Sequence, residues 1–357
     1  MGNLKAFRQI AEDQLTDIGN TAKLHNVLFV LLKYQGSVLA VVMIGSAPTQ
    51  SAIVQKVFGS VYTVLDPGSK ESWTVKLAGR LRLTKHREYS QYRHLLAVGD
   101  QILHDGRQIT AVEPRRNELA RARIGEIQVL GANLDQAILV SSLTHPEVNF
   151  RFVDRFLVAA SAGRVEPFLL FTKVDLGVPA DTLQYVSLYG DMGYRTMFIN
   201  LLEPGQDLSR LRVILEGQIT LLTGRSGTGK STLLNCLGGE FRTASVSVHR
   251  KGKHTTTNSE LLHLGPNTMV IDSPGIKDWG LLHLSRVEIL EGFPELAQAA
   301  QECPLDCEHR EGDTRCAVDR KIREGNMHPE RLRSLLAIFA EEPIRSHSGY
   351  KRAAKGR

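Results

Sequence analysis

The sequence predicts a multidomain protein. A small β-barrel, an α/β domain with a parallel sheet, and a helical region with a metal site are expected to follow one another. Short β-rich runs separated by turn signals occupy residues 50–113. Five apolar runs between residues 136 and 272 are separated in several places by helix-spaced segments. Three cysteines and a histidine gather within residues 303–316.

The composition fits a chain of about three domains. The chain has 357 residues, a formal net charge of +6 and four cysteines, so it is not a disulfide scaffold. The expected boundaries are residues 1–48 for an N-terminal extension of unassigned role, 49–120 for the barrel, 121–290 for the α/β domain and 291–357 for the C-terminal region with its basic tail.

The N-terminal extension contains an apolar stretch, residues 27–44, that is long enough to consider as a membrane span. Lys33 and the Gln35–Gly36 pair lie near its centre, which favours two β-strands joined by a turn. The first twenty residues lack the layout of a signal peptide, and Ala6 interrupts a myristoylation pattern. We therefore expect a cytoplasmic, monomeric protein without a membrane segment.

The barrel is predicted from short runs rich in β-branched and aromatic residues. Asp66, Pro67 and Gly68 mark a tight turn within this region. The spacing of the runs is typical of a small antiparallel barrel. A purely structural β domain is the alternative to a nucleic-acid-binding one. The runs are residues 52–58, 60–69, 72–83 and 99–112.

The α/β domain is predicted from apolar runs that alternate with helical patterns, an arrangement typical of a parallel sheet. The clearest helical pattern has apolar residues at positions 152, 153, 156, 157 and 160. The predicted strands are residues 136–143, 168–172, 197–201, 218–222 and 268–272.

Residues 224–232, GRSGTGKST, form a predicted phosphate-binding loop after an apolar strand. Its glycines let backbone N–H groups turn inward around phosphates, and the following helix points its positive end at the same anion. We expect Lys230 to bridge the β- and γ-phosphates and Ser231 to hold Mg²⁺. The predicted phosphate-binding residues are Gly224, Arg225, Ser226, Gly227, Thr228, Gly229, Lys230, Ser231 and Thr232.

A second phosphate-side motif follows in residues 270–275, VIDSPG. Asp272 ends a predicted strand and is expected to reach Mg²⁺ through water, while the Gly275 N–H is expected to contact the γ-phosphate. Between the two motifs, GKHTTT at residues 252–257 offers Thr256 or Thr257 as a further Mg²⁺ ligand. A transporter ATPase would need a longer interval and its own signature sequence, and neither is present.

A third motif precedes the phosphate-binding loop. The run FLLFTKVDL, residues 168–176, ends a strand with Thr172, Lys173 and Asp175. It resembles the guanine-specificity motif of GTPases, in which Asp175 would accept from guanine N1–H and the 2-amino group while Lys173 packs along the base. Thr172 stands where the motif usually has asparagine, so one side-chain amide is missing.

The order of these motifs resembles that of the circularly permuted GTPases. With GKHTTT and a cysteine cluster near the C-terminus, the chain resembles in particular the small-ribosomal-subunit-dependent GTPases of ribosome small-subunit biogenesis. The resemblance covers about residues 50–320. It implies an OB-fold in the barrel, a barrel type often used on oligonucleotides. It also implies binding of GTP and GDP with Mg²⁺, and the small ribosomal subunit and its rRNA as partners.

The same resemblance implies that the protein assists late maturation of the subunit, which would stimulate its GTPase activity. The base-side loop departs from the usual Ser-Ala-Lys. Residues 200–202 read Asn-Leu-Leu at that place.

The cysteine cluster indicates a metal site. Cys303, Cys307, His309 and Cys316 make a Cys₃His set that suits tetrahedral structural zinc with no open position. The family that the chain resembles has a zinc site here, with spacings that differ by about one residue on either side of the Cys-x-His pair. We expect Cys236, after the phosphate-binding loop, to be packed rather than reactive.

The reaction implied is hydrolysis of GTP to GDP and phosphate, with Lys230 and Mg²⁺ stabilising the transferred charge. Ile276 follows the DSPG motif where many GTPases place a water-orienting glutamine, and isoleucine cannot hydrogen-bond water. We therefore expect slow intrinsic turnover and a partner that completes the site. His254 is the candidate for positioning the water, and solvation of its loop is the alternative role.

Positive charge is concentrated at the barrel and the C-terminal tail. Residues 80–123 contain ten Lys and Arg against five acidic residues, and residues 345–357 contain five against none. Such surfaces suit contact with a phosphate backbone, and the tail also fits a solvated chain end. Two rival functions are a P-loop ATPase and an RNA-binding scaffold with a vestigial nucleotide site. A comparison of guanine with adenine nucleotide binding distinguishes a GTPase from the ATPase. A turnover assay with purified small subunits distinguishes it from the scaffold.

Overall fold

The computed structural model describes residues 21–24, 27–34, 37–45, 50–79, 81, 91–123, 126–238 and 259–341. Several expectations fall outside these described residues. They are the basic residues Arg80, Arg82, Lys85 and Arg87, the segment 252–257 with His254, Thr256 and Thr257, and the basic tail 345–357.

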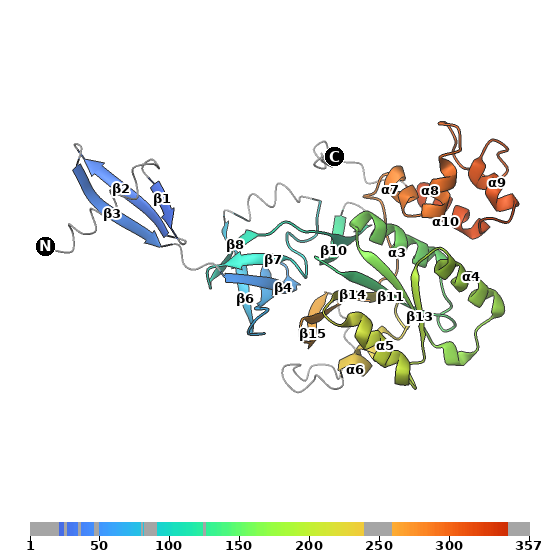
Figure 1. Ribbon diagram of the computed structural model, residues 1–357, viewed down its shortest axis with the longest axis horizontal. Helices are drawn as coiled ribbons and strands as arrows, with labels where there is room; N and C mark the ends of the chain where they lie inside the picture. The colour runs from blue at the N-terminus through green and yellow to red at the C-terminus, as the bar shows by residue number, and fades with distance from the viewer. Residues whose placement is uncertain are drawn as a thin grey trace.

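The N-terminal extension contains a three-stranded antiparallel sheet, shown in blue at one end of the molecule in Figure 1. Its strands are β1 (Thr21–Leu24), β2 (Val27–Tyr34) and β3 (Ser37–Gly45). Strands β2 and β3 pair in a register that places Tyr34 opposite Ser37, which confirms two strands around Gln35–Gly36. Within the described part of the chain, no helix has the length and apolar character needed to cross a membrane.

The predicted barrel is present as a closed ring of five strands. Strand β4 pairs with both β5 and β7, and the ring continues through β6 and β8. The β6–β8 pairing is parallel, and the other four pairings of the ring are antiparallel. The strands are β4 (Gln50–Phe58), β5 (Val61–Leu65), β6 (Ser72–Leu77), β7 (Gln101–His104) and β8 (Gln108–Val112).

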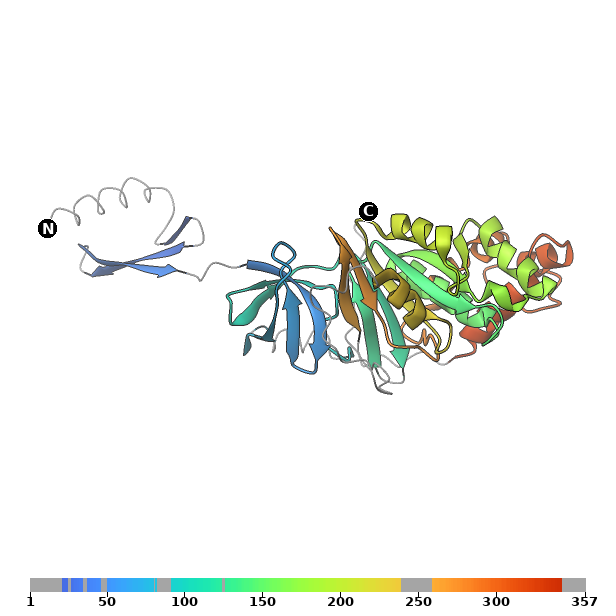
Figure 2. The ribbon, with the colours of Figure 1, turned by 90° about the horizontal axis from the view of Figure 1, so that it is seen from below.

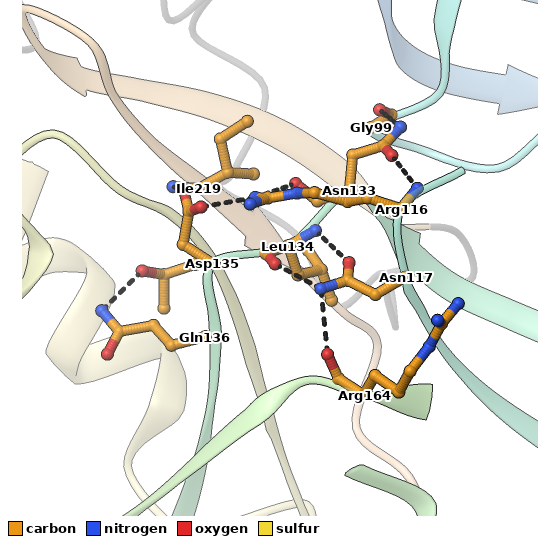
Figure 3. A network of polar contacts seen from close by, with 10 residues as sticks. Gly99, Arg116, Asn117, Asn133, Leu134, Asp135, Gln136, Arg164 and Ile219 are labelled. Atoms are coloured by element: carbon orange, nitrogen blue, oxygen red, sulfur yellow. Dashed lines mark hydrogen bonds and ion pairs between the residues drawn. The ribbon is translucent and has the colours of Figure 1, made fainter. Parts of the chain in front are cut away.

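A hairpin and its turns join the barrel to the next domain. The hairpin consists of β9 (Glu118–Arg123) and β10 (Glu126–Ala132). Asn133 donates to the Gly99 carbonyl of the barrel at 3.0 Å and accepts from the Arg116 N–H at 3.0 Å. Asp135 accepts from the Ile219 N–H at 2.7 Å, so Figure 3 shows one polar network that reaches from the barrel to the α/β sheet.

The α/β domain contains the predicted parallel sheet, in the order β13-β12-β11-β14-β16. Strand β11 is central, since it pairs in parallel with both β12 and β14. All five predicted runs therefore form strands. Their bounds are β11 (Gln136–Ser142), β12 (Glu166–Thr172), β13 (Arg195–Ile199), β14 (Ile219–Gly224) and β16 (Thr268–Asp272).

Helices cover both faces of this sheet (Figure 1). The apolar residues of α3 pack in one core with those of α4, whereas Leu211 and Leu233 place α5 and α6 in a separate core on the other face. Asn149 caps α3 by accepting from the Phe152 N–H at 3.0 Å. The helices are α3 (Phe150–Gly163), α4 (Ala180–Asp191), α5 (Gly205–Leu215) and α6 (Lys230–Gly238).

One strand that the sequence analysis did not predict connects the two sheets. Strand β15 (Glu260–Gly265) pairs antiparallel with β16, and its ladder with β4 has one register position, Glu260 opposite Lys56. Figure 2 shows this orange hairpin between the blue barrel and the green sheet. The barrel and the α/β domain consequently share one eleven-stranded sheet.

The C-terminal region is helical and packs against α3. Arg331 is only 2% exposed and forms ion pairs with Asp154 of α3 and, at 2.7 Å, with Glu295. Tyr189 of α4 donates to Asp154 at 2.8 Å. The helices are α7 (Arg286–Glu291), α8 (Pro294–Ala300), α9 (Ala317–Arg323) and α10 (Pro329–Phe339).

We predict that Asp154→Ala lowers the free energy of unfolding by about 3–5 kcal/mol, because it leaves the Arg331 guanidinium buried without its main counter-ion. Urea denaturation followed by circular dichroism measures the loss. Asp191→Ala is the matched control, since Asp191 is an exposed acid at the end of α4. Equal midpoints for the two variants would contradict the prediction.

Candidate functional site

The predicted phosphate-binding loop lies between β14 and α6, as the motif requires. Gly224 ends β14 opposite Val140 of β11, and a Cβ at Gly224 would lie 2.4 Å from the Val140 carbonyl oxygen. Only glycine fits that approach. Ser231 and Thr232 are exposed on the first turn of α6, where a helix N-terminus attracts anions.

The threonine of the TKVD motif contacts the phosphate-binding loop directly. The fully buried Thr172 hydroxyl donates to the Thr228 carbonyl at 2.7 Å. Gly229 is also close to Thr172, since a Cβ at Gly229 would be 3.7 Å from the Thr172 hydroxyl oxygen. The two motifs are 56 residues apart in sequence and adjacent in space. Thr172 therefore anchors the loop rather than pointing into open solvent.

The other two residues of that motif face outward. Lys173 adopts a left-handed backbone with φ of 60°, and its ammonium donates to the His145 carbonyl. Asp175 follows in the short 3₁₀ helix η1 (Val174–Leu176) and is exposed. Its exposed carboxylate lies three residues after Thr172, whose hydroxyl contacts the phosphate-binding loop.

The DSPG segment lies against the phosphate-binding loop on its other side. Asp272 is 4% exposed and forms an ion pair with Lys230. A Cβ at Gly275 would lie 2.9 Å from the Ser226 hydroxyl oxygen, so the two backbones are in close contact. The structure thus brings together the predicted residues of all three motifs around the carboxyl ends of β12, β14 and β16.

Ile276 is buried rather than turned toward the loop. It is 1% exposed, and its N–H donates to the Gly224 carbonyl at 3.1 Å. Its side chain belongs to the core shared with α3. The position after DSPG therefore supplies no polar group to the site. The segment with His254, Thr256 and Thr257 lies outside the described residues, so their predicted roles stay predictions.

The base-side loop that departs from Ser-Ala-Lys packs against the phosphate-binding loop. A Cβ at Gly229 would lie 2.9 Å from Leu201 Cδ1. Asn200 accepts from the Leu202 N–H at 2.9 Å, and Leu202 is 79% exposed. An exposed leucine and an inward leucine thus stand at the edge of the candidate base site.

The cysteine cluster is assembled in the helical region. The ligand atoms of Cys303, Cys307, His309 and Cys316 lie within 4.8 Å of one another. His309 Nδ1 is 3.7 Å from Cys303 Sγ, 3.5 Å from Cys307 Sγ and 3.7 Å from Cys316 Sγ. A tetrahedron built from zinc–sulfur and zinc–nitrogen bond lengths has edges of about 3.5–3.8 Å. The four side chains therefore fit a tetrahedral metal ion.

Backbone donors surround this cluster. The Ala317 N–H points at Cys303 Sγ at 3.3 Å, and the Asp319 N–H at Cys316 Sγ at 3.4 Å. Burial raises the pKa of the Cys316 thiol to about 12 and lowers the pKa of His309, which keeps the imidazole neutral. A divalent cation would reverse the thiol's preference by stabilising thiolates. The donor set and its surroundings thus suit a structural metal.

Two contributors to the site were missed from sequence. His145 presents the carbonyl that holds Lys173, and Glu260 stands directly opposite Asp272 in the β15–β16 ladder. Neither belongs to a motif with fixed spacing. The alternation of Leu262, His263 and Leu264 before a Gly-Pro-Asn turn was the available signal for β15.

Comparison with known proteins gives a consistent result. A family model described as RsgA GTPase matches residues 112–282. A protein of Porphyromonas gingivalis named Small ribosomal subunit biogenesis GTPase RsgA is 36% identical over 310 residues, covering 81% of this chain and 96% of that protein. A Bacteroides fragilis protein of the same name is 36% identical over 283 residues, covering 75% and 89%.

Two solved structures share the fold. The crystal structure of YjeQ from Thermotoga maritima matches with a TM-score of 0.61 and 24% identity, covering 82% of this chain and 100% of that chain. The crystal structure of YloQ, described as a circularly permuted GTPase, matches with a TM-score of 0.59 and 23% identity, covering 83% and 96%. The likeness thus extends over more than four fifths of this chain in both cases.

We predict that Cys307→Ser abolishes binding of about one metal ion per chain, because a Cys₃His site that loses one thiolate loses a quarter of its tetrahedral ligands. Elemental analysis of protein purified without chelator measures the metal. Hydrogen exchange should then accelerate in α8 and α9. Cys236→Ser is the control, since Cys236 lies on α6 outside the cluster. A wild-type protein that carries no metal would refute the site.

Proposed function

This chain belongs to the RsgA GTPase family, and from that membership we propose that it is a GTP hydrolase that binds the small ribosomal subunit and assists its late maturation. The observation that carries the nucleotide-binding part is the contact between Thr172 and Thr228, since it joins the base-side motif to the phosphate-binding loop. Relatives named small ribosomal subunit biogenesis GTPase support the choice of partner.

The phosphate end of the proposed site uses the loop backbone and two charged side chains. Lys230 and Asp272 neutralise each other in the structure. On nucleotide binding the lysine would move to the β- and γ-phosphates, and Asp272 would be released toward Mg²⁺ held with Ser231. Magnesium supplies charge neutralisation when bound. The Gly275 backbone, which lies against Ser226, would donate to the γ-phosphate.

The base end of the proposed site divides its work between two side chains. Asp175 would accept from guanine N1–H and the 2-amino group, an arrangement that adenine cannot satisfy. Thr172 would act through the phosphate-binding loop, because its hydroxyl is already bound to the Thr228 carbonyl. This division favours guanine selectivity without the usual asparagine, and it disfavours the P-loop ATPase alternative.

The hydrolytic step lacks a water-positioning group among the described residues around the γ-phosphate end. Water would attack the γ-phosphorus, the bond to the bridging oxygen would break, and GDP would leave. Ile276 is packed in the core and cannot orient that water. We therefore infer that intrinsic turnover is slow and that the subunit completes the site, with His254 as the candidate for water positioning.

We further propose that the Cys₃His cluster binds zinc and that the barrel contacts rRNA. Three thiolates and an imidazole are the ligands that zinc prefers in closed structural sites. The ring of five strands has the form of the OB barrels that bind oligonucleotides. Basic residues between 80 and 87 would add phosphate contacts. A scaffold with a vestigial nucleotide site is the rival, and the intact Lys230 and Ser231 oppose it.

We predict different effects for two substitutions at the base end. Asp175→Asn should weaken GTP binding by about 2–3 kcal/mol and shift selectivity toward XTP, because an amide pairs with the xanthine carbonyl. Thr172→Val should weaken GTP and XTP binding alike by about 1–2 kcal/mol, because it loosens the phosphate-binding loop. Titration with both nucleotides measures the two effects.

Thr172→Ser is the control for that pair, since it keeps the hydroxyl that donates to Thr228. Unchanged GTP affinity in Asp175→Asn would mean that TKVD is an ordinary strand end. A change of base preference in Thr172→Val would mean that this side chain reads the base itself.

We predict that small subunits bind about tenfold more tightly with a non-hydrolysable GTP analogue than with GDP, and that they increase GTP turnover. Binding should weaken as salt rises, because phosphate contacts release counter-ions. Replacing Arg80, Arg82, Lys85 and Arg87 by alanine should reduce binding and stimulation together. Sedimentation with purified subunits and parallel phosphate release measure these effects. Equal binding of both nucleotide states, or turnover indifferent to subunits, would overturn the proposed partner.

A further inference from the structure

Three charged residues lie in register across three strands at the junction of the barrel and the α/β sheet. Lys56 of β4 pairs with Glu260 of β15, and Glu260 pairs with Asp272 of β16. Lys230, at the start of α6, contacts Asp272. The row therefore runs from the barrel to the phosphate-binding loop. Figure 2 shows the hairpin that carries its two middle members between the two domains.

The order of charges in this row is positive, negative, negative, positive. Residues directly opposite each other in a ladder project to the same face of the sheet, and like charges in that position repel. Here each carboxylate forms an ion pair with a lysine at its own end of the row. Lys56 Nζ lies 2.8 Å from Glu260 Oε1, and Lys230 pairs with Asp272. Each of the two neighbouring carboxylates therefore has a lysine as its counter-ion in the structure.

Binding of nucleotide would change this balance at one end only. On the proposed function, Lys230 moves to the phosphates and Asp272 turns to Mg²⁺. The Glu260 carboxylate then adds to the negative potential that attracts Mg²⁺, and the Lys56 ammonium subtracts from it. Lys56 belongs to the barrel, so a charge in one domain acts on the metal end of the other.

The junction is built closely enough for this effect to operate. Gln55, next to Lys56, donates to the Leu261 carbonyl at 3.2 Å, which holds β15 against the barrel. Asp272 is 4% exposed, so water screens it little. Lys56 and Glu260 are about one third exposed, with side-chain values of 33% and 32%. Solvent reduces their influence without removing it.

We propose that Glu260 and Lys56 are positioning residues for Mg²⁺–GTP. Glu260 strengthens the hold of Asp272 on the metal ion, and Lys56 moderates it from the barrel. This inference rests on the proposed role of Asp272. It assigns a function to a strand that contains none of the nucleotide-binding motifs.

Titration of Mg²⁺ into the full-length protein, saturated with a fluorescent GTP analogue at low ionic strength, tests the proposal. Glu260→Gln should raise the Mg²⁺ concentration at half-saturation by about threefold, because a negative charge near the metal is lost. Lys56→Gln should lower it by about the same factor. The double variant should return close to the wild-type value. Lys76→Gln, on the exposed side of β6, is the control for overall charge and should leave the value unchanged.

The opposite signs separate electrostatics from packing, since loss of a structural contact would shift both single variants the same way. The swapped pair Lys56→Glu with Glu260→Lys gives a second separation. It keeps the ion pair but places a positive charge beside Asp272, so it should need more Mg²⁺ than the wild type. Shifts in the same direction, no shift, or full recovery in the swapped pair would overturn the proposal. A wild-type protein that fails to bind the analogue would instead overturn the nucleotide-binding function.

Discussion

The parallel pairing of β11 with β12 on one side and β14 on the other is the constraint on which the nucleotide site depends. It places the carboxyl ends of β12 and β14 on either side of β11. The chain nevertheless forms β12, with the base-side motif, before β14, with the phosphate-binding loop, which is the reverse of the usual order. The hydroxyl of Thr172 then spans to the Thr228 carbonyl and fixes the base-side motif to the phosphate-binding loop. Circular permutation changes the order in which the chain connects the strands, but each strand keeps the same neighbours in the sheet. The motifs at the strand ends can therefore still form one site.

The other modules are held away from the carboxyl ends of these strands. The network around Asn133 and Asp135 ties the barrel to the amino ends of the strands, away from the nucleotide loops (Figure 3). The buried group of Arg331, Asp154 and Glu295 fixes the C-terminal helices to α3. A buried ionic group is costly to leave incomplete, which makes this docking specific. The β15 junction approaches the site itself, through the row of charges that begins at Lys56.

Much of the site could be predicted from the sequence, because its motifs have fixed spacing. Gly224, Lys230 and Ser231 follow from the geometry of phosphate binding, and Asp272 follows from the strand end that DSPG requires. The metal cluster was predictable for the same reason, since Cys303, Cys307, His309 and Cys316 must lie within one short wrap of chain to surround an ion. The five parallel strands and α3 were predictable because buried strands and amphipathic helices carry strong apolar patterns.

The sequence by itself thus determined which chemical groups are present and that the base motif precedes the phosphate-binding loop. The tertiary structure decided what those groups do to one another. Thr172 was predicted as part of the base-side motif with one side-chain amide missing, and the structure adds that its hydroxyl holds the loop. The sequence shows an apolar residue at position 276, and the structure explains it, because the Ile276 side chain is buried in the core. Strand β15 had only a short alternating run as its signal, and the pairing of Glu260 with Asp272 had no sequence signature. The physical reason is that such contacts join residues far apart in the chain, and their partners are selected by strand pairing and packing rather than by local pattern.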